Sequence, residues 1–344
     1  METKKAKFIH FIGIDVSKGK IDVWLCLNFG AEGQFWSEFE QSKKGFAAFK
    51  KWLQSHTGKD MSQVFVCLEN TGLYDDAILY FLADNNIAVC LENAATIKAA
   101  KRDQRQKNDK IDAREIALYA ARYLDELEIW EKPRAIIEQL KQLLSQRSSF
   151  VEHLKGLKQR QKEIDGFKWA GVKKVKNYTA GVKGLEKDIE AIEKAIWELI
   201  KSDQALHKMY ILIVSIPSVG KITAWHFICY TNEFKRVKSG KNLSAYCGVV
   251  PFKEDSGTSI RKPPRLPNRA NFILKTLLHL CAMTAIKMKG EFAQYYQKKI
   301  AEGKHVLKAL NSVRNKLALR IAAVIRDEIP YDENYDYKAL RSAA

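Results

Sequence analysis

The sequence predicts a mixed α/β domain at the N-terminus, then a long helical hairpin and a mostly α-helical C-terminal region. Two apolar runs, at 8–16 and 20–25, flank a short polar turn, as is typical of a β-hairpin. The apolar runs that follow alternate with helical patterns, which suits a mixed sheet covered by helices on both faces. Beyond this region apolar residues recur at helical spacing alone. We therefore expect three parts: 1–128, 129–203 and 204–344.

The expected elements of the first part alternate in type. The predicted elements are a strand at 34–39, a helix at 43–53, a strand at 63–68, a helix at 74–85 and a strand at 87–91. A further helix should begin near Asn108 or Asp109, since both are good N-cap residues. Its apolar residues Ile111, Leu118 and Ala121 are expected to face inward.

Two long helical patterns, 134–164 and 185–200, predict an antiparallel helical hairpin with a Gly- and Lys-rich turn at 166–184. Packing within the chain and a coiled-coil dimerisation arm explain this pattern equally well. The stretch 213–221 resembles the turn of a helix-hairpin-helix element, whose backbone N–H groups can contact a phosphate. Helices at 270–288, 291–302 and 306–327 complete the predicted C-terminal region.

The charge of the chain is uneven. Its formal net charge is +18, yet residues 1–100 hold 11 Lys and Arg against 12 Asp and Glu, which places +19 in residues 101–344. A strongly basic region of this size indicates a polyanionic partner. No apolar run is long enough to span a bilayer, and we expect no targeting segment before the first strand. The six scattered cysteines are expected to be buried thiols in a reducing compartment.

Acidic residues follow the ends of predicted strands. Asp15 and Glu69 each lie at the C-terminal end of such a strand, where open sheets place their ligand sites. Asp109 and Asp112 lie three residues apart at the start of a predicted helix and so share a face. Four carboxylates gathered at one point raise one another's pKa or recruit a cation. Since all the donors are oxygen, Mg²⁺ or Mn²⁺ is the cation expected.

The motifs around these residues, in this order, resemble the Asp-Glu-Asp-Asp transposases of the insertion-sequence family one-ten, whose relatives include the Piv DNA invertase. The N-terminal motifs are Gly13-Ile14-Asp15-Val16-Ser17-Lys18, Leu68-Glu69-Asn70-Thr71-Gly72 and Lys107-Asn108-Asp109-Lys110-Ile111-Asp112. The C-terminal motifs are Ile216-Pro217-Ser218-Val219-Gly220, Cys247-Gly248-Val249-Val250-Pro251 and Ser256-Gly257-Thr258-Ser259-Ile260-Arg261. The resemblance covers nearly the whole chain.

The resemblance implies a RuvC-like N-terminal domain of the RNase H fold and a C-terminal transposase domain, on either side of the predicted coiled-coil hairpin. It implies that Asp15, Glu69, Asp109 and Asp112 bind the metal and that Ser256 attacks DNA to form a phosphoserine link. It also implies a bridge RNA as guide, dimers that pair into tetramers, and action on DNA in the bacterial cytosol and nucleoid. Ser256 is then expected to meet the carboxylates of another protomer.

Basic residues surround Ser256, and a guanidinium or ammonium group can hold a phosphate. The expected nucleic-acid contacts are Lys253, Arg261, Lys262, Arg265 and Arg269. The family usually has a glycine with basic neighbours before the next helix, whereas this chain has Pro267-Asn268-Arg269-Ala270-Asn271-Phe272. Pro263-Pro264 also stiffens the segment that leads to this stretch. These departures leave open which basic residues contact phosphate.

Other functions fit parts of the pattern. A RuvC-like endonuclease would use water as its nucleophile and would not need Ser256. An actin-like sugar kinase or ATPase shares the opening hairpin but needs further Gly-rich phosphate loops, which we do not find in the sequence. In a non-catalytic binding module the four carboxylates would have no role, and their negative charge would repel the polyanion that the protein binds.

Overall fold

The computed structural model describes residues 7–70, 74–100, 108–166, 178–235, 237, 239–250, 255–256, 260–261 and 270–333. The chain forms two compact units, Met1–Lys132 and Pro133–Ala344. In the part of the chain just defined, none of the helices is both long enough and apolar enough to cross a membrane.

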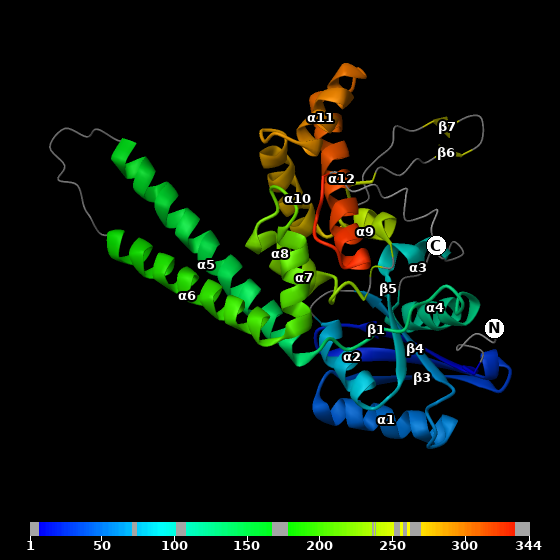
Figure 1. Ribbon diagram of the computed structural model, residues 1–344. Helices are drawn as coiled ribbons and strands as arrows, with labels where there is room; N and C mark the ends of the chain where they lie inside the picture. The colour runs from blue at the N-terminus through cyan, green and yellow to red at the C-terminus, as the bar shows by residue number, and fades with distance from the viewer. Residues whose placement is uncertain are drawn as a thin grey trace. The chain divides into compact units, whose positions relative to one another are not determined.

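The first unit is built on a five-stranded sheet of order β3-β2-β1-β4-β5 (Figure 1). Its strands are β1 (His10–Val16), β2 (Lys20–Leu27), β3 (Gly33–Glu40), β4 (Val64–Asn70) and β5 (Ala88–Asn93). β1, β2 and β3 pair antiparallel, whereas β1, β4 and β5 pair parallel. Every residue of β1 is buried except Asp15, which is half-buried. The expected central strand, apolar on both faces, is therefore confirmed.

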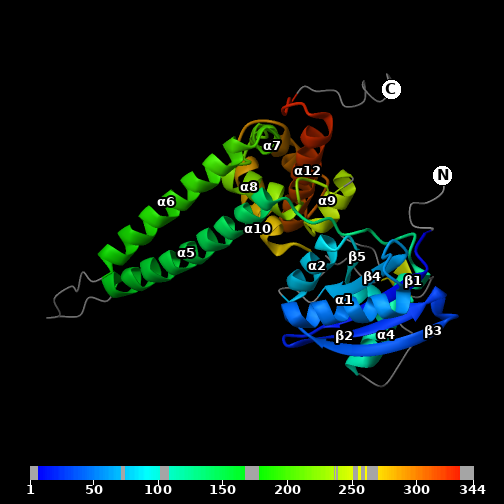
Figure 2. The same cartoon turned by 90° about the horizontal axis from the view of Figure 1, so that it is seen from below.

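Helices cover both faces of the sheet, as Figure 2 shows for α1 and α4 on opposite sides of β2. The helical segments of this unit are η1 (Asn28–Gly30), α1 (Lys43–Thr57), α2 (Asp75–Asp84), α3 (Ala94–Ala100) and α4 (Asp109–Arg122). One apolar core lies between α1, α2 and the face of β1 that carries Ile12 and Ile14. The other lies between α3, α4 and the face that carries Phe11. Alternate residues of β1 thus serve separate cores.

Helix α4 packs on the sheet through Ile116 and several small residues, and not through the expected stripe. Ala113, Ala117 and Ala120 are fully buried, whereas Ile111 and Leu118 are only partly buried. The reason is a close approach to Gly13, where an added Cβ would lie 2.1 Å from the carbonyl oxygen of Ala113. A face of large side chains would hold the helix too far from the sheet for this contact.

The second unit is helical, and its first two helices lie side by side and antiparallel in both views (Figures 1 and 2). They are α5 (Ala135–Gly166) and α6 (Thr179–Ser202). Ion pairs join them, with Arg147 Nη2 lying 2.8 Å from a carboxylate oxygen of Glu193. The expected turn at 166–184 is too long, because α6 already begins at Thr179. The exposed Gly184 weakens this helix without ending it.

Compact helices and one two-stranded hairpin make up the rest of this unit. They are α7 (Gln204–Val214), α8 (Lys221–Tyr230), α9 (Gly240–Tyr246), β6 (Asp255–Ser256), β7 (Ile260–Arg261), α10 (Phe272–Ala285), α11 (Glu291–Ala301) and α12 (Val306–Asp327). Trp225, Phe227 and Leu274 are among the side chains of its core, with Ile137 and Ile196 at the base of α5 and α6. All six cysteines of the chain are buried and unbridged, as expected.

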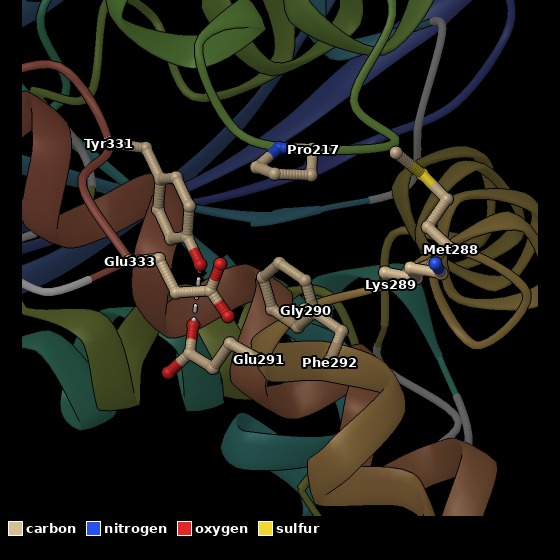
Figure 3. A pocket seen from close by; sticks show the side chains of 9 residues that line it. Pro217, Met288, Lys289, Gly290, Glu291, Phe292, Tyr331 and Glu333 are labelled. Atoms are coloured by element: carbon tan, nitrogen blue, oxygen red, sulfur yellow. Dashed lines mark hydrogen bonds between the residues drawn. The ribbon is translucent and has the colours of Figure 1, made fainter.

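Glu291, at the start of α11, links three segments of the second unit. Its carboxylate accepts hydrogen bonds from Arg320 of α12 and from the Tyr331 hydroxyl, at 2.9 Å for Tyr331 (Figure 3). The Lys316 ammonium lies 2.9 Å away. Burial raises the pKa of Glu291, but these donors outweigh burial and hold the pKa below its ordinary value. Glu291 also lines the pocket in Figure 3, together with Pro217 and Met288, and its bonds there are structural.

We expect Glu291→Gln to lower the free energy of unfolding by about 2 kcal/mol at pH 7, because charge-assisted bonds at a mostly buried site are lost. Since the pKa of Glu291 is lower in the folded than in the unfolded state, its contribution is complete above the unfolded value of 4.5. It is lost as the pH falls through the folded value. Urea unfolding at pH 7 and near pH 4 should therefore give a difference between variant and wild type that shrinks in acid.

The matched control is Glu302→Gln at the other end of α11, where the Lys299–Glu302 pair is more exposed. Its effect should be much smaller than that of Glu291→Gln, because solvent screens the exposed pair. Equal effects of the two substitutions would contradict the role given to Glu291.

Candidate functional site

Four acidic residues occupy neighbouring positions across the sheet. Asp15 of β1 lies opposite Asp22 of β2, and Glu69 of β4 lies beside Glu92 of β5. Ile14 of β1 pairs with Leu68 of β4, and Asp15 and Glu69 are the next residues of the two strands. The two acids therefore lie at neighbouring positions. Since side chains alternate along a strand, all four acids belong to the face that α4 covers. Two of them, Asp22 and Glu92, were not predicted as part of a site.

Two further carboxylates come from the start of α4. The Asn108 side chain accepts a hydrogen bond from the Lys110 backbone N–H at 3.1 Å and so caps this helix, as one of the two predicted alternatives. Asp109 and Asp112 lie in its first turn, where the helix dipole favours negative charge. The close packing of α4 against Gly13 keeps this turn near the end of β1.

The carboxylates act on one another at Asp15. Burial, followed by the charges of Asp112, Asp109, Glu69 and Asp22 in that order, raises the pKa of Asp15 to about 6. All four residues expected at the site therefore contribute to one electrostatic environment. Asp15 lies at its centre, because the charges of the other three all act on it.

Lys20 is the cation of this edge. Its ammonium lies 3.1 Å from Asp22, 3.0 Å from Glu38 and 3.8 Å from Asp109. Hydrogen bonds to Glu38 and Asp22 raise the pKa of Lys20 above its ordinary value, so it stays charged. This lysine compensates the buried Asp22. Lys20 stands two residues before Asp22, directly after a tight turn. This spacing in the sequence indicates that the two side chains lie on the same face of β2, but Lys20 was not predicted as part of the site.

The donor set fits a hard divalent cation in its chemistry. Every donor is a carboxylate oxygen, as Mg²⁺ and Mn²⁺ prefer, and the raised pKa of Asp15 records a repulsion that a cation would relieve. Within the described residues, however, no three acidic, histidine or cysteine side chains are close enough together to hold an ion. Binding would therefore draw the carboxylates inward.

Ser256 belongs to the second unit. It lies in β6 and pairs with Ile260 of β7. The expected phosphate contact Arg261 lies in β7. Lys253, Lys262, Arg265 and Arg269 fall outside the residues that the structure describes. Their roles, and that of the Ser256 hydroxyl, stay predictions.

Comparison with known proteins decides the family. Residues 12–164 match the family model of DEDD transposases of the IS110 type, and residues 211–297 match the transposase family IS116/IS110/IS902. The chain belongs to the IS110 transposase family. The resemblance inferred from the motifs is thereby confirmed, and the first match contains all four acidic residues predicted as ligands.

Relatives of this transposase extend along its whole length. The pilin gene-inverting proteins of Moraxella lacunata and Moraxella bovis are each 25% identical to it over 329 residues, covering 94% of this chain and 98% of theirs. A protein of insertion element IS116 from Streptomyces clavuligerus is 27% identical over 144 residues, covering 42% of this chain and 35% of its own. The family acts on DNA, which agrees with the polyanionic partner that the charge predicts.

Proposed function

We propose that this transposase cuts and exchanges DNA strands in a Mg²⁺- or Mn²⁺-dependent reaction, with Ser256 as the nucleophile. Asp15, Glu69, Asp109 and Asp112 would hold the cation. The observation that carries the proposal is the raised pKa of Asp15, to which the three other predicted ligands contribute. Perturbed carboxylates of this kind are typical of functional sites.

The sheet supports the assignment of the first unit to the RuvC-like, RNase H-type fold. Three antiparallel strands continue into two parallel ones, in the order β3-β2-β1-β4-β5. In such an arrangement the C-terminal ends of β1 and β4 meet at one edge, where a ligand site is expected. An actin-like kinase would share this sheet, but it would leave Asp109 and Asp112 at the start of α4 without a role.

The proposed chemistry is a transesterification. The Ser256 oxygen bonds to a DNA phosphorus, the bond from that phosphorus to a deoxyribose oxygen breaks, and the leaving oxygen takes up a proton. Serine is a weak nucleophile until its hydroxyl proton is accepted by a base, and a carboxylate of the cluster would accept it. A bound divalent cation would supply charge stabilisation for the attacking and leaving oxygens. The phosphoserine bond would conserve the energy needed for strand rejoining.

Ser256→Ala tests this proposal. We expect the variant to form no denaturation-resistant protein–DNA adduct when full-length protein, Mg²⁺ and DNA carrying the element's ends are mixed and resolved on a denaturing gel. The matched control is Ser259→Ala, a serine three residues away that should leave the adduct intact. The alternative function, a RuvC-like structure-specific endonuclease, predicts free DNA ends and indifference to both substitutions. An adduct that persists in Ser256→Ala would exclude Ser256 as the nucleophile.

We propose further that a bridge RNA guides the reaction and that dimers of the chain pair into tetramers on DNA. The +19 charge of residues 101–344 supports a large nucleic-acid surface, and the DNA substrate implies action in the bacterial cytosol and nucleoid. In the predicted three-part division, α5 and α6 would form the coiled-coil dimerisation arm. Sequencing the nucleic acid that copurifies with the protein tests the guide: a discrete RNA from one locus supports it, and random fragments contradict it.

A further inference from the structure

Arg314 differs from the three cations of α12 that form ion pairs. Lys316 and Arg320 of this helix pair with Glu291, and Arg326 pairs with Asp327. Arg314 is partly buried, and no carboxylate of the described residues pairs with it. Its Nε atom is fully buried and has no hydrogen-bond partner. A guanidinium withdrawn from water without a partner is destabilising, and such groups are normally paired.

The surroundings of Arg314 contain no other charge that explains it. Burial alone lowers the pKa of Arg314, without an acidic neighbour among the described residues to raise it again. Asn311 and Asn315 lie on the same side of the helix, three residues before and one after, and the Oδ1 atom of each is also buried without a partner. This part of α12 is polar and cationic, and three of its buried polar atoms find no partner within the described residues.

The same helix face lies next to the start of the segment that leads to Ser256. The Asn311 Nδ2 atom donates a hydrogen bond to the carbonyl oxygen of Val249 at 2.8 Å. Val249 precedes Ser256 by seven residues. Lys275 of α10 is also close, with its Cδ atom 3.8 Å from the Cβ position of Gly248. A second cation therefore lies beside the same turn.

We propose that Arg314 is a binding site for a backbone phosphate of the nucleic acid on which the transposase acts. A guanidinium presents paired N–H donors that match a phosphate, and an anion beside this partly buried group would balance its charge. This inference rests on the proposed function, and it adds a phosphate contact outside the motifs around Ser256. The Asn311–Val249 bond would couple that contact to the position of the chain before the nucleophile.

The test compares Arg314→Gln with Arg326→Gln in the full-length protein. Both substitutions remove one charge from α12, but Arg326 is exposed and paired with Asp327. Fluorescence anisotropy over a range of KCl concentrations should use a DNA duplex and an RNA duplex of the same sequence. Arg314→Gln should weaken binding about tenfold and lower the slope of log K against log[salt] by about 1. Arg326→Gln should change affinity less than about twofold. A loss with one duplex alone identifies which nucleic acid supplies the phosphate.

Stability distinguishes this role from a structural one. In protein free of nucleic acid, Arg314→Gln should keep or raise Tm, because a partly buried, unpaired charge is removed. Inorganic phosphate at 20 mM serves as the probe, roughly 100 times a sub-millimolar Kd. It should raise the Tm of the wild type and leave the Tm of Arg314→Gln unchanged. Wild-type affinity and salt slope in Arg314→Gln would overturn the inference, whatever its Tm. If Arg314→Gln does not fold, Arg314→Lys is the variant to test, because lysine keeps the charge but lacks the planar guanidinium group. Weaker nucleic-acid binding by Arg314→Lys supports the site, and unchanged binding overturns it.

Failure of this inference and failure of the proposed function give different results. If wild-type protein forms the Ser256 adduct while Arg314→Gln binds normally, the phosphate site alone is wrong. If wild-type protein binds neither duplex, both are wrong.

Discussion

Asp15→Asn should abolish strand cleavage and at the same time stabilise the metal-free protein at neutral pH. The loss of activity should reach about 10³-fold or more, since a central ligand of a catalytic cation contributes several kcal/mol. The gain in stability follows from the raised pKa of Asp15, about 6. An amide at this position removes the repulsion with Asp112, Asp109 and Glu69. DNA cleavage assays and thermal unfolding in the presence of a chelator measure the two effects.

The pH dependence of this effect has a definite sign. Because Asp15 is a weaker acid in the folded than in the unfolded state, where its pKa is near 3.8, the native state binds more protons between these values. The free energy of unfolding should therefore fall as the pH rises from about 4 to about 6, by roughly 1–2 kcal/mol once the shift is discounted for the solvent exposure of Asp15. Asp15→Asn should lack this fall. Its advantage over the wild type should consequently grow from about pH 4 and be complete above about pH 6.

Added Mg²⁺ should reverse the order of stability. A cation that binds the folded state alone at 100 times its Kd stabilises that state by about 2.7 kcal/mol. Wild-type protein should gain Tm on addition of Mg²⁺, and Asp15→Asn should not. The control Asp84→Asn changes an exposed acid that pairs with Lys132, and it should keep wild-type activity and the Mg²⁺ response. A metal-free Asp15→Asn variant less stable than the wild type would refute the repulsive cluster.

Local patterns predicted most of the fold. The β1–β2 hairpin followed from two apolar runs around a polar turn, because strand formation and turn chemistry are both local. The two long helices followed from their spacing of apolar residues, and α12 was predicted with its observed bounds, Val306–Asp327. Errors lay at helix ends such as Thr179, where an exposed glycine inside a helix resembles a turn.

The candidate site was predictable only in part, because its geometry depends on pairing between distant segments. Asp22 could have been placed opposite Asp15 by the register of a tight hairpin. Glu92 could not, because its position beside Glu69 depends on parallel pairing of β4 with β5. The inward stripe of α4 was predicted from large apolar residues, whereas contact with Gly13 selects small ones.

Gly13→Ala should both destabilise the first unit and inactivate the enzyme, although glycine and alanine differ by one methyl group. An added Cβ would lie 2.1 Å from the Ala113 carbonyl oxygen and 2.3 Å from the Ala117 backbone nitrogen. Both atoms belong to the backbone of α4, so the clash cannot be relieved by a side-chain rotation. The whole helix must move away from β1. Overpacking against backbone atoms should lower the free energy of unfolding by about 3 kcal/mol.

The same displacement explains the expected loss of activity. Asp109 and Asp112 are carried by the first turn of α4, so moving the helix separates them from Asp15. A shift of about 1 Å at a reacting centre can lower the rate about 10²-fold. Gly19→Ala is the matched control, because it lies in the adjoining turn with no atom within 4 Å of its Cβ position. It should leave Tm and cleavage close to wild type. A Gly13→Ala variant with wild-type stability and full cleavage would mean that the contact between α4 and β1 does not position the two aspartates.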